Sequence, residues 1–395
     1  LIHTNSNNSS IDLLDLADPE NPERIRSISV PGEPTSVSVS PDGNWAMAVV
    51  YAGKSKTAKK PIDPRLPGLL TLIDMRNPAE AEIIKFIGIG HQPDSITIKE
   101  SGSDLIAIIA IENEPFFVEE VAVNEDQPGQ KIDISLPGSI EIISIDPFAP
   151  ERYVSNIIKL DAETLNQAGM LFPDDPQPEF VAASPNSELV AVTLQENNGI
   201  ILIDLSSKEI ITAFSVGKTS EQLTDLKNDS EIKLEQNYPT DIADQPYAGV
   251  RFPDGLVFHP DGNYLITADE GEFNLSGGRG FSIWSLQGEL VWDDAGEIER
   301  EAAALDLYPD DHSEIMGVEI DGITSARFGT TDYAFALSEP GSFVAIYDVS
   351  DPRAPVFLQI IPTAGGPESA VAIPARNLLV VAGEAGGTIT LISTP

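Results

Sequence analysis

Residues 320–360 read IDGITSARFGTTDYAFALSEPGSFVAIYDVSDPRAPVFLQI and hold one complete cycle of four short strands. An inner strand begins near Asp321, and a strongly apolar second strand ends just before Glu339. The third strand, Ala345-Ile-Tyr-Asp-Val, ends in an acid and a turn, and the more polar fourth strand is Pro355-Val-Phe-Leu-Gln-Ile. Short runs rich in Val, Ile, Leu and Phe, separated by Pro, Gly, Asn and Asp, are typical of an all-β fold.

The same cycle recurs along the whole chain, and hardly any segment has the periodicity of a helix. Inner strands are expected to begin near Thr35, Asp94, Glu179, Asp254, Asp321 and Glu368. Residues before Thr35 supply three further strands, around 1–3, 11–16 and 24–30. The pattern predicts an all-β fold: a seven-bladed β-propeller of four-stranded antiparallel blades, as one domain over residues 1–395.

The two ends of the chain carry incomplete blades in this scheme. The first blade lacks its inner strand and the last lacks its outer strand. Both gaps would be filled by residues upstream of Leu1, so we expect the natural N-terminus to be longer. A sandwich of two packed sheets is the alternative architecture, but a fixed four-strand order repeated this often favours the propeller.

Composition limits the classes of partner. The chain carries 63 acidic residues against 23 Lys and Arg, a formal net charge of −40. Such a surface repels nucleic acid and anionic lipid, so we expect neither as a partner. The absence of cysteine excludes disulfides, thiolate metal sites and cysteine nucleophiles. No run approaches the ~20 apolar residues that span a membrane, and we expect an exported protein: extracellular, at the cell surface or periplasmic.

Six long insertions are expected on one face of the propeller. In this fold, the loops that enter inner strands and those that join second to third strands lie on the same face. The insertions all have one of these two positions: 52–67, 114–137, 160–178, 217–253, 271–278 and 293–319. Because function tends to reside on elaborated loops over a rigid scaffold, this face is the predicted binding or active face. Neutral decoration is the alternative.

Two layers of carboxylates belong to that face. The first layer stands at the inner-strand starts: Asp94, Glu179, Asp254, Asp321 and Glu368. The second stands at the ends of second strands: Glu112, Glu196, Glu270, Glu339 and Glu384. Crowded carboxylates repel one another, and a bound divalent cation relieves that repulsion. Ca²⁺ fits best, because it takes several oxygen ligands. The alternative is that these acids accept backbone hydrogen bonds and fix the packing of the blades.

Basic residues on the same face are candidates for binding an anion or an acidic partner. The candidates are Lys59, Lys60, Arg65, Arg251 and Arg279. A run of lysines in a long insertion is also typical of a solvated loop. His91, His259 and His312 are weaker candidates, because single histidines are more often structural. No Ser-His-Asp spacing, phosphate-binding glycine loop or His-Glu-x-x-His is present, so the usual hydrolase and nucleotide signatures are missing.

Several stretches together resemble one family. They are Leu194-Gln-Glu-Asn-Asn-Gly-Ile-Ile-Leu-Ile-Asp, Arg279-Gly-Phe-Ser-Ile-Trp-Ser-Leu-Gln-Gly-Glu-Leu-Val-Trp-Asp, Tyr347-Asp-Val-Ser-Asp-Pro, Gly366-Pro-Glu-Ser-Ala and Leu379-Val-Val-Ala-Gly-Glu-Ala-Gly-Gly-Thr. In this order they are similar to the choice-of-anchor I family of bacterial secreted or surface proteins. The resemblance implies a seven-bladed propeller outside the cytoplasm, and some members are labelled alkaline phosphatase. Family members typically read Pro-Glu-Gly at an inner-strand start, where this chain has Ile320-Asp321-Gly322 and Pro367-Glu368-Ser369.

Three functions are compatible with these patterns. The first is a secreted or cell-surface propeller that binds divalent cations and a partner, a protein or surface polymer, through its acidic face, without chemistry of its own. The second is a Ca²⁺-dependent phosphoesterase resembling propeller phytases or alkaline phosphatases, in which bound ions activate water. The third is a structural subunit of a larger extracellular assembly that uses the insertions as docking arms.

Overall fold

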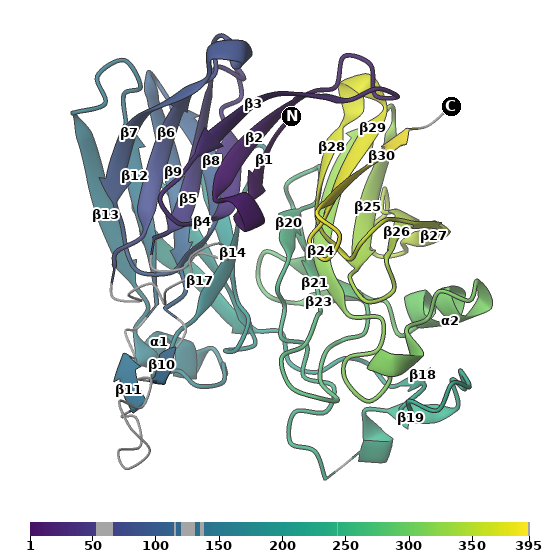
Figure 1. The fold of residues 1–395 in the computed structure, drawn as a ribbon. Coiled ribbons are helices and arrows are strands. Elements are labelled where there is room, and N and C mark those ends of the chain that lie inside the picture. The colour runs from purple at the N-terminus through teal and green to yellow at the C-terminus, as the bar shows by residue number, and fades with distance from the viewer. Residues whose placement is uncertain (53–65, 114–115, 120–130, 135–137, 243, 394–395) are drawn as a thin grey trace, which may run out of the picture. The chain divides into compact units, whose positions relative to one another are not determined.

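The computed structural model of the protein consists mainly of β-strands in seven blade sheets (Figure 1). It describes residues 1–52, 66–113, 116–119, 131–134, 138–242 and 244–393. Five blade sheets have four strands, and the first and last have three each. The predicted seven blades and the incomplete end blades are therefore confirmed, and the two-sheet sandwich is wrong.

The strands of each blade follow one another in the chain, as the predicted cycle requires. The first three sheets contain β1 (Ile2–Asn5), β2 (Ser10–Asp15) and β3 (Glu23–Ser29); β4 (Glu33–Val39), β5 (Trp45–Tyr51), β6 (Leu69–Asp74) and β7 (Glu82–Gly88); and β8 (Pro93–Ser101), β9 (Asp104–Ile111), β12 (Ser139–Ile145) and β13 (Tyr153–Lys159). The fourth and fifth contain β14 (Pro178–Ala183), β15 (Leu189–Leu194), β16 (Gly199–Asp204) and β17 (Glu209–Ser215); and β20 (Leu256–Phe258), β21 (Tyr264–Ala268), β22 (Phe281–Ser285) and β23 (Leu290–Asp293). The last two contain β24 (Ile320–Phe328), β25 (Thr331–Ser338), β26 (Phe343–Asp348) and β27 (Val356–Pro362); and β28 (Pro367–Ile373), β29 (Leu378–Gly383) and β30 (Thr388–Ser393).

The long insertions add local structure that the strand pattern does not predict. Their described residues hold two hairpins, β10 (Phe116–Glu119) with β11 (Lys131–Ile134) and β18 (Gln222–Thr224) with β19 (Gln236–Tyr238). Two α-helices, α1 (Ala162–Gln167) and α2 (Glu297–Ala304), also lie there. Short 3₁₀ turns are η1 (Ser6–Asn8), η2 (Pro78–Glu80), η3 (Thr240–Ile242), η4 (Asp310–His312) and η5 (Pro374–Arg376). In the described part of the chain, no helix is long and apolar enough to cross a membrane.

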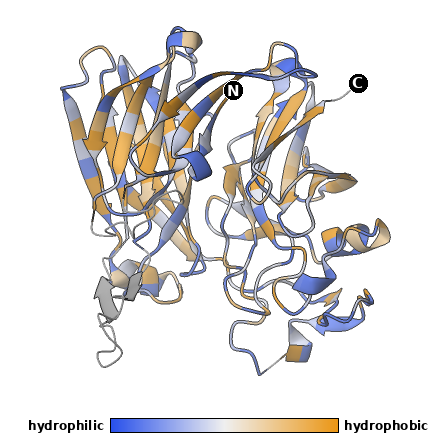
Figure 2. Cartoon of the chain, in the orientation of Figure 1, coloured by the Kyte–Doolittle hydropathy of each residue, from blue (hydrophilic) through white to orange (hydrophobic). Residues whose placement is uncertain are grey.

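The chain divides into two compact units. Unit 1 comprises Leu1–Ala162 and Asp174–Val181, and unit 2 comprises Glu163–Pro173 and Ala182–Pro395. Each unit has its own apolar clusters. Figure 2 shows hydrophobic residues concentrated on the strands and hydrophilic residues on the connections.

The middle strands of each blade form the core. All seven residues of β5 are buried, whereas most residues of β3 and β13 are exposed. A middle strand packs on both faces, so its sequence reads as a continuous apolar run instead of an alternating one. This difference between middle and outer strands is the physical reason that the four-strand cycle can be recognised in the sequence.

Three inner strands begin with a register shift at a predicted acid. In β24 the pairing passes from Ile320 to Gly322, and in β28 from Pro367 to Ser369, which leaves Asp321 and Glu368 as the extra residues. The pairing of β8 shifts in the same way around Asp94. A bulge re-aims the side chain of its extra residue. Asp94, Asp321 and Glu368 are therefore set apart from the regular ladder.

Three insertions of unit 2 pack against one another. The backbone amide of Gly277 donates to Val250 O over 2.7 Å, and the amide of Leu275 donates to Ile315 O over 2.6 Å. These bonds join the insertions 217–253, 271–278 and 293–319, so the prediction that they share one face is confirmed within unit 2. In unit 1, residues 53–65 and much of 114–137 lie outside the described residues.

Candidate metal centre

Antiparallel pairing places the two acidic layers at the same end of each sheet. In β24 and β25, Ile320 pairs with Ser338, so Asp321 and Glu339 lie at one end of the blade. In β28 and β29, Pro367 pairs with Gly383, which brings Glu368 and Glu384 to the corresponding end. The strand register thus produces the two layers that the sequence predicts.

Three carboxylates of unit 2 form a compact group, the unit 2 triad: Glu270, Glu319 and Asp321. One oxygen of each lies within 4.8 Å of the others. Glu319 and Asp321 are 7% and 6% exposed, and Glu270 is half-buried. Glu319 is absent from the sequence prediction, because it precedes the strand start and has a backbone φ of 42° within an insertion.

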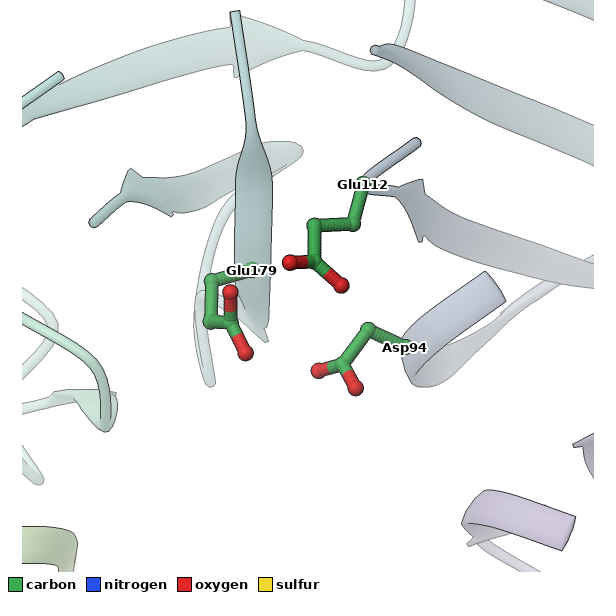
Figure 3. Close-up of side chains that lie close together, drawn as sticks. All are labelled: Asp94, Glu112 and Glu179. Atoms are coloured by element: carbon green, nitrogen blue, oxygen red, sulfur yellow. The ribbon is translucent and has the colours of Figure 1, made fainter. Parts of the chain in front are cut away.

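Three carboxylates of unit 1 form a second group, the unit 1 triad: Asp94, Glu112 and Glu179. Their nearest oxygens also lie within 4.8 Å of one another, and all three side chains are half-buried. Figure 3 shows the carboxylates facing a common space, with Asp94 from the start of β8, Glu112 after β9 and Glu179 at the start of β14.

The two triads share a geometrical rule. In each, the acid that follows a second strand meets the acid that starts the inner strand of the next blade: Glu112 with Glu179, and Glu270 with Asp321. The close approach of neighbouring inner strands makes this possible. The amide of Gly255 donates to Asp321 O over 3.1 Å, and a Cβ at Gly255 would lie 2.7 Å from that oxygen.

The surroundings of Glu270 and Asp321 favour the protonated forms of these two carboxyl groups when no cation is present. Burial raises the pKa of Asp321 well above its usual range, and the negative charge of Glu319 adds to the effect. Burial likewise raises the pKa of Glu270, assisted by the charge of Asp254. Low exposure removes the water that would stabilise the anions, and each anion disfavours its neighbours.

Hydrogen bonds hold the unit 2 triad in place. Oδ2 of Asp321 accepts a hydrogen bond from the backbone N–H of Glu339 over 3.0 Å. A contact of this kind is expected if the strand-start acids fix the packing of the blades, the alternative to metal binding. Nδ1 of His312 lies 2.9 Å from Oε2 of Glu319. Residue His312, a weak candidate from the sequence, therefore lies beside the triad.

The remaining predicted acids surround these groups in part. Burial raises the pKa of Glu368, and a hydrogen bond with Glu384 and repulsion by the charge of Glu384 raise this pKa further. Burial also raises the pKa of Glu339. The charge of Asp254 acts on Glu368 as well as on the unit 2 triad. Five of the predicted acids belong to neither triad among the described residues: Glu196, Asp254, Glu339, Glu368 and Glu384. Asp94 and Glu179 belong to unit 1, and the other inner-strand acids belong to unit 2.

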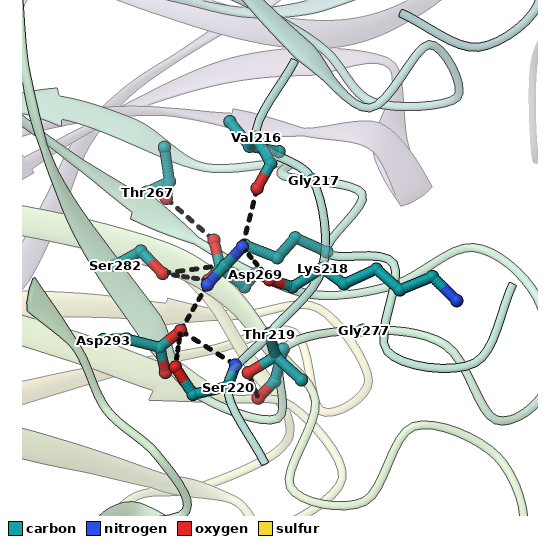
Figure 4. A network of polar contacts seen from close by, with 12 residues as sticks. Val216, Gly217, Lys218, Thr219, Ser220, Thr267, Asp269, Gly277, Ser282 and Asp293 are labelled. Carbon is teal, nitrogen blue, oxygen red and sulfur yellow. Dashed lines mark hydrogen bonds and ion pairs between the residues drawn. The ribbon is translucent and has the colours of Figure 1, made fainter. Parts of the chain in front are cut away.

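Two of the candidate anion-binding residues are enclosed in protein contacts. Arg251 is buried; its Nε donates to Asp269 Oδ2 over 3.0 Å, and its Nη2 forms an ion pair with Asp293. The guanidinium also donates to Val216 O and to Ser282 Oγ. Figure 4 shows Val216, Asp269, Ser282 and Asp293 gathered in this polar network.

Arg279 is also buried, with Nη1 3.3 Å from Glu299 Oε1 and Nη2 donating to Ser313 O over 2.8 Å. The other candidates, Lys59, Lys60 and Arg65, lie outside the described residues.

Comparisons with known proteins agree with this architecture. A family model described as the choice-of-anchor I domain matches residues 1–275 and 272–352. No curated protein matches the chain. Among solved structures, hydrazine synthase of Kuenenia stuttgartiensis is 16% identical with a TM-score of 0.59, over 100% of this chain and 92% of that chain.

Two further similar structures carry lactonase names. A putative 6-phosphogluconolactonase from Bacteroides uniformis is 13% identical, with a TM-score of 0.57, over 100% of this chain and 91% of that chain. The periplasmic gluconolactonase of Pseudomonas aeruginosa is 12% identical, with a TM-score of 0.52, over 100% and 99%. Identities this low indicate a common fold and nothing about activity. Because the family model covers well over half of the chain, this seven-bladed β-propeller belongs to the choice-of-anchor I family.

Proposed function

We propose that the protein is a secreted or cell-surface propeller that binds Ca²⁺ at its carboxylate triads and presents the acidic, loop-rich face to a partner. The observation that carries this proposal is the unit 2 triad, in which Glu270, Glu319 and Asp321 offer oxygens within 4.8 Å of one another at buried or half-buried positions. Membership of the choice-of-anchor I family supports a location outside the cytoplasm.

The spacing of the triad suits Ca²⁺. Two oxygens that bind the same Ca²⁺ at about 2.4 Å lie at most about 4.8 Å apart. The three carboxylate oxygens of the triad all lie within 4.8 Å of one another, so one ion can contact all three. Three carboxylates with carbonyl or water oxygens would complete a shell of six to eight ligands. A bound ion would also stabilise the anionic forms that burial and repulsion now disfavour.

Isothermal titration calorimetry on protein first stripped with EDTA tests this proposal. We expect Ca²⁺ to bind at two sites, one for each triad, and Mg²⁺ to bind more weakly because it demands a smaller octahedral shell. The variant Glu270→Gln/Asp321→Asn should lose one site. The matched control Glu209→Gln/Asp306→Asn changes two exposed acids and should keep both sites. No heat of binding in the wild type would refute the proposal.

Metal-dependent hydrolysis is a second candidate, favoured by the position of His312. Its imidazole lies 2.9 Å from Glu319, so a general acid or base would stand beside a bound ion. The assay is the release of p-nitrophenol from p-nitrophenyl phosphate, with Ca²⁺ and with EDTA. Ca²⁺-dependent turnover that disappears in His312→Gln while Ca²⁺ still binds would identify an enzyme. Absence of turnover with both triads occupied would favour the binding function.

A further inference from the structure

Four aromatic residues of unit 2 form one cluster, the aromatic patch: Phe172, Tyr247, Phe252 and Phe273. The rings of Tyr247 and Phe273 are stacked with centroids 4.5 Å apart. Phe252 meets Phe273 edge-on at 5.5 Å, and Phe172 lies 6.2 Å from Tyr247. These residues come from three insertions that are distant in the sequence, so the patch is created by the fold.

The aromatic patch has a buried base and an exposed top. Phe252 is buried, whereas Phe172 and Phe273 are 42% and 37% exposed and Tyr247 is half-buried. Exposed single hydrophobic residues are common, but several aromatic rings gathered at one place mark an interaction site more often. Aromatic residues are also enriched at the centres of binding interfaces.

Buried amides hold the aromatic patch in a strained backbone geometry. Nδ2 of Asn197 donates to the backbone oxygens of Leu171 and Phe172, each over 3.0 Å. Oδ1 of Asn198 accepts the N–H of Phe252 over 2.9 Å. Phe172 and Phe252 have φ values of 47° and 45°, which are outliers for bulky residues. Strain of this kind persists where the surroundings over-determine it, and it clusters at functional sites.

The segments that form and support the aromatic patch are strongly acidic. They are residues 166–173, 195–198, 244–254 and 270–276, and besides the triad member Glu270 they carry four carboxylates: Glu196, Asp244, Asp254 and Glu272. Their single basic residue is Arg251, whose charge is buried among Asp269 and Asp293. Exposed rings therefore stand in a region of negative potential.

We propose that the aromatic patch binds the guanidinium or ammonium groups of a basic segment of a partner protein. The face of an aromatic ring is negative and attracts such cations, and surrounding carboxylates add to that attraction. Arginine is the best match, because its planar guanidinium stacks on rings and pairs with carboxylates. Charge complementarity favours this occupant, since a cation gains an electrostatic attraction to the surplus of carboxylates that a neutral sugar does not, and an anion is repelled.

Fluorescence anisotropy with a labelled peptide of alternating Arg and Gly tests the proposal, in 150 mM NaCl and EDTA so that Ca²⁺ binding has no part in the result. The same peptide with Gln in place of Arg should bind more weakly. Phe273→Ala and Tyr247→Ala should weaken binding of the Arg peptide roughly threefold to thirtyfold. Phe86→Ala is the matched control, because Phe86 is 45% exposed on β7 of unit 1, and its affinity should equal that of the wild type.

Further variants distinguish binding at the aromatic patch from non-specific electrostatic binding and from misfolding of the variant. Phe273→Leu keeps apolar volume but removes the ring, so it should weaken binding as Phe273→Ala does, with an unchanged circular dichroism spectrum and Tm. Equal affinities for wild type, Phe273→Leu and Phe86→Ala would overturn the proposal, because binding would then be general electrostatics. Phe273-dependent binding of a β-1,4-linked glucose oligomer, without binding of the Arg peptide, would also overturn it and assign the patch to carbohydrate.

Discussion

Nε2 of Gln195 donates a hydrogen bond to Oε2 of Glu270 over 2.9 Å. The same nitrogen donates to Gly271 O, also over 2.9 Å. The loop that follows β15 therefore fixes Glu270, the half-buried member of the unit 2 triad. Asn197 and Asn198 of the same loop hold the aromatic patch. One short loop thus positions both candidate binding features of unit 2. A substitution of Gln195 should therefore weaken cation binding at the triad more than it lowers the stability of the blades.

Arg251 is expected to be a structural residue. Replacing Arg251 by Met would leave Asp269 and Asp293 buried without their cation, which should lower the free energy of unfolding by about 3–5 kcal/mol. Arg251→Lys should recover only part of this, because an ammonium cannot reproduce the fork that reaches Asp269, Asp293 and Val216 O together. Urea unfolding measures the change.

The control for Arg251 is Arg327, which pairs with Asp332 at 2.6 Å but has a side chain 54% exposed. Arg327→Met should lower the free energy of unfolding far less than Arg251→Met does, because exposed ion pairs contribute little to stability. Similar decreases in the free energy of unfolding for Arg251→Met and Arg327→Met would contradict the structural role of Arg251 and favour the predicted anion-binding role.

Asp294 predicts a pH dependence of stability. Burial raises the pKa of this carboxyl from 3.8 to about 8. A group with a raised pKa in the folded state contributes its full stability below pH 3.8 and loses it as the pH rises through 8, because the folded state then holds a proton that the unfolded state has released. The contribution should fall by up to about 1.4 kcal/mol per pH unit between these values.

The measurement for Asp294 is Tm between pH 5 and 8.5. Asp294→Asn keeps an oxygen that can accept from Tyr347 Oη, now 3.1 Å away, and should flatten the fall in Tm. Asp306→Asn changes an exposed acid and should leave the slope unchanged. Equal slopes for wild type and Asp294→Asn would show that this carboxyl is not the source of the dependence.

Gly322 is expected to be required for the close approach of β24 and β28. A Cβ at this position would overlap the backbone oxygen of Glu368, a group that cannot move as a flexible side chain could. Gly322→Ala should therefore cost at least about 1–3 kcal/mol of unfolding free energy, and it should disturb the neighbouring Asp321. In Gly88→Ala, the new methyl group has no atom within 4 Å, so this variant should remain within about 0.5 kcal/mol of the wild type in urea unfolding. A neutral Gly322→Ala would contradict the packing.

The blades could be predicted from the sequence because their middle strands are apolar on both faces. This feature gives β5 and β9 an unbroken hydrophobic pattern that no exposed strand shares. The acids at the strand starts were predictable for a related reason: Pro precedes Asp94, Glu179 and Glu368 at the point where pairing begins.

The composition of the triads was beyond the reach of the strand pattern. Which carboxylates meet depends on the offset between neighbouring blades, and Glu319 joins Asp321 through the conformation of an insertion. Helix α2 was missed because its Glu299 is buried against Arg279, a tertiary pairing with no trace in local periodicity. Because Glu299 lies 20 residues after Arg279, the sequence alone did not show that this arginine has a carboxylate partner, and Arg279 was predicted to bind an anion.

Thermal unfolding of the wild type and of Asp94→Asn/Asp321→Asn, in EDTA and in millimolar Ca²⁺, tests the central claim of cation binding at the triads most directly. In EDTA the variant should unfold at or above the wild-type Tm, because each triad has lost one of the carboxyl groups that repel one another within it. In Ca²⁺ the order should reverse, since each site gains about 2.7 kcal/mol when the free ion is 100-fold above its dissociation constant. The control Asp15→Asn/Asp306→Asn should follow the wild type. A wild-type Tm that is the same in EDTA and Ca²⁺, or a variant that gains as much as the wild type, would contradict the claim.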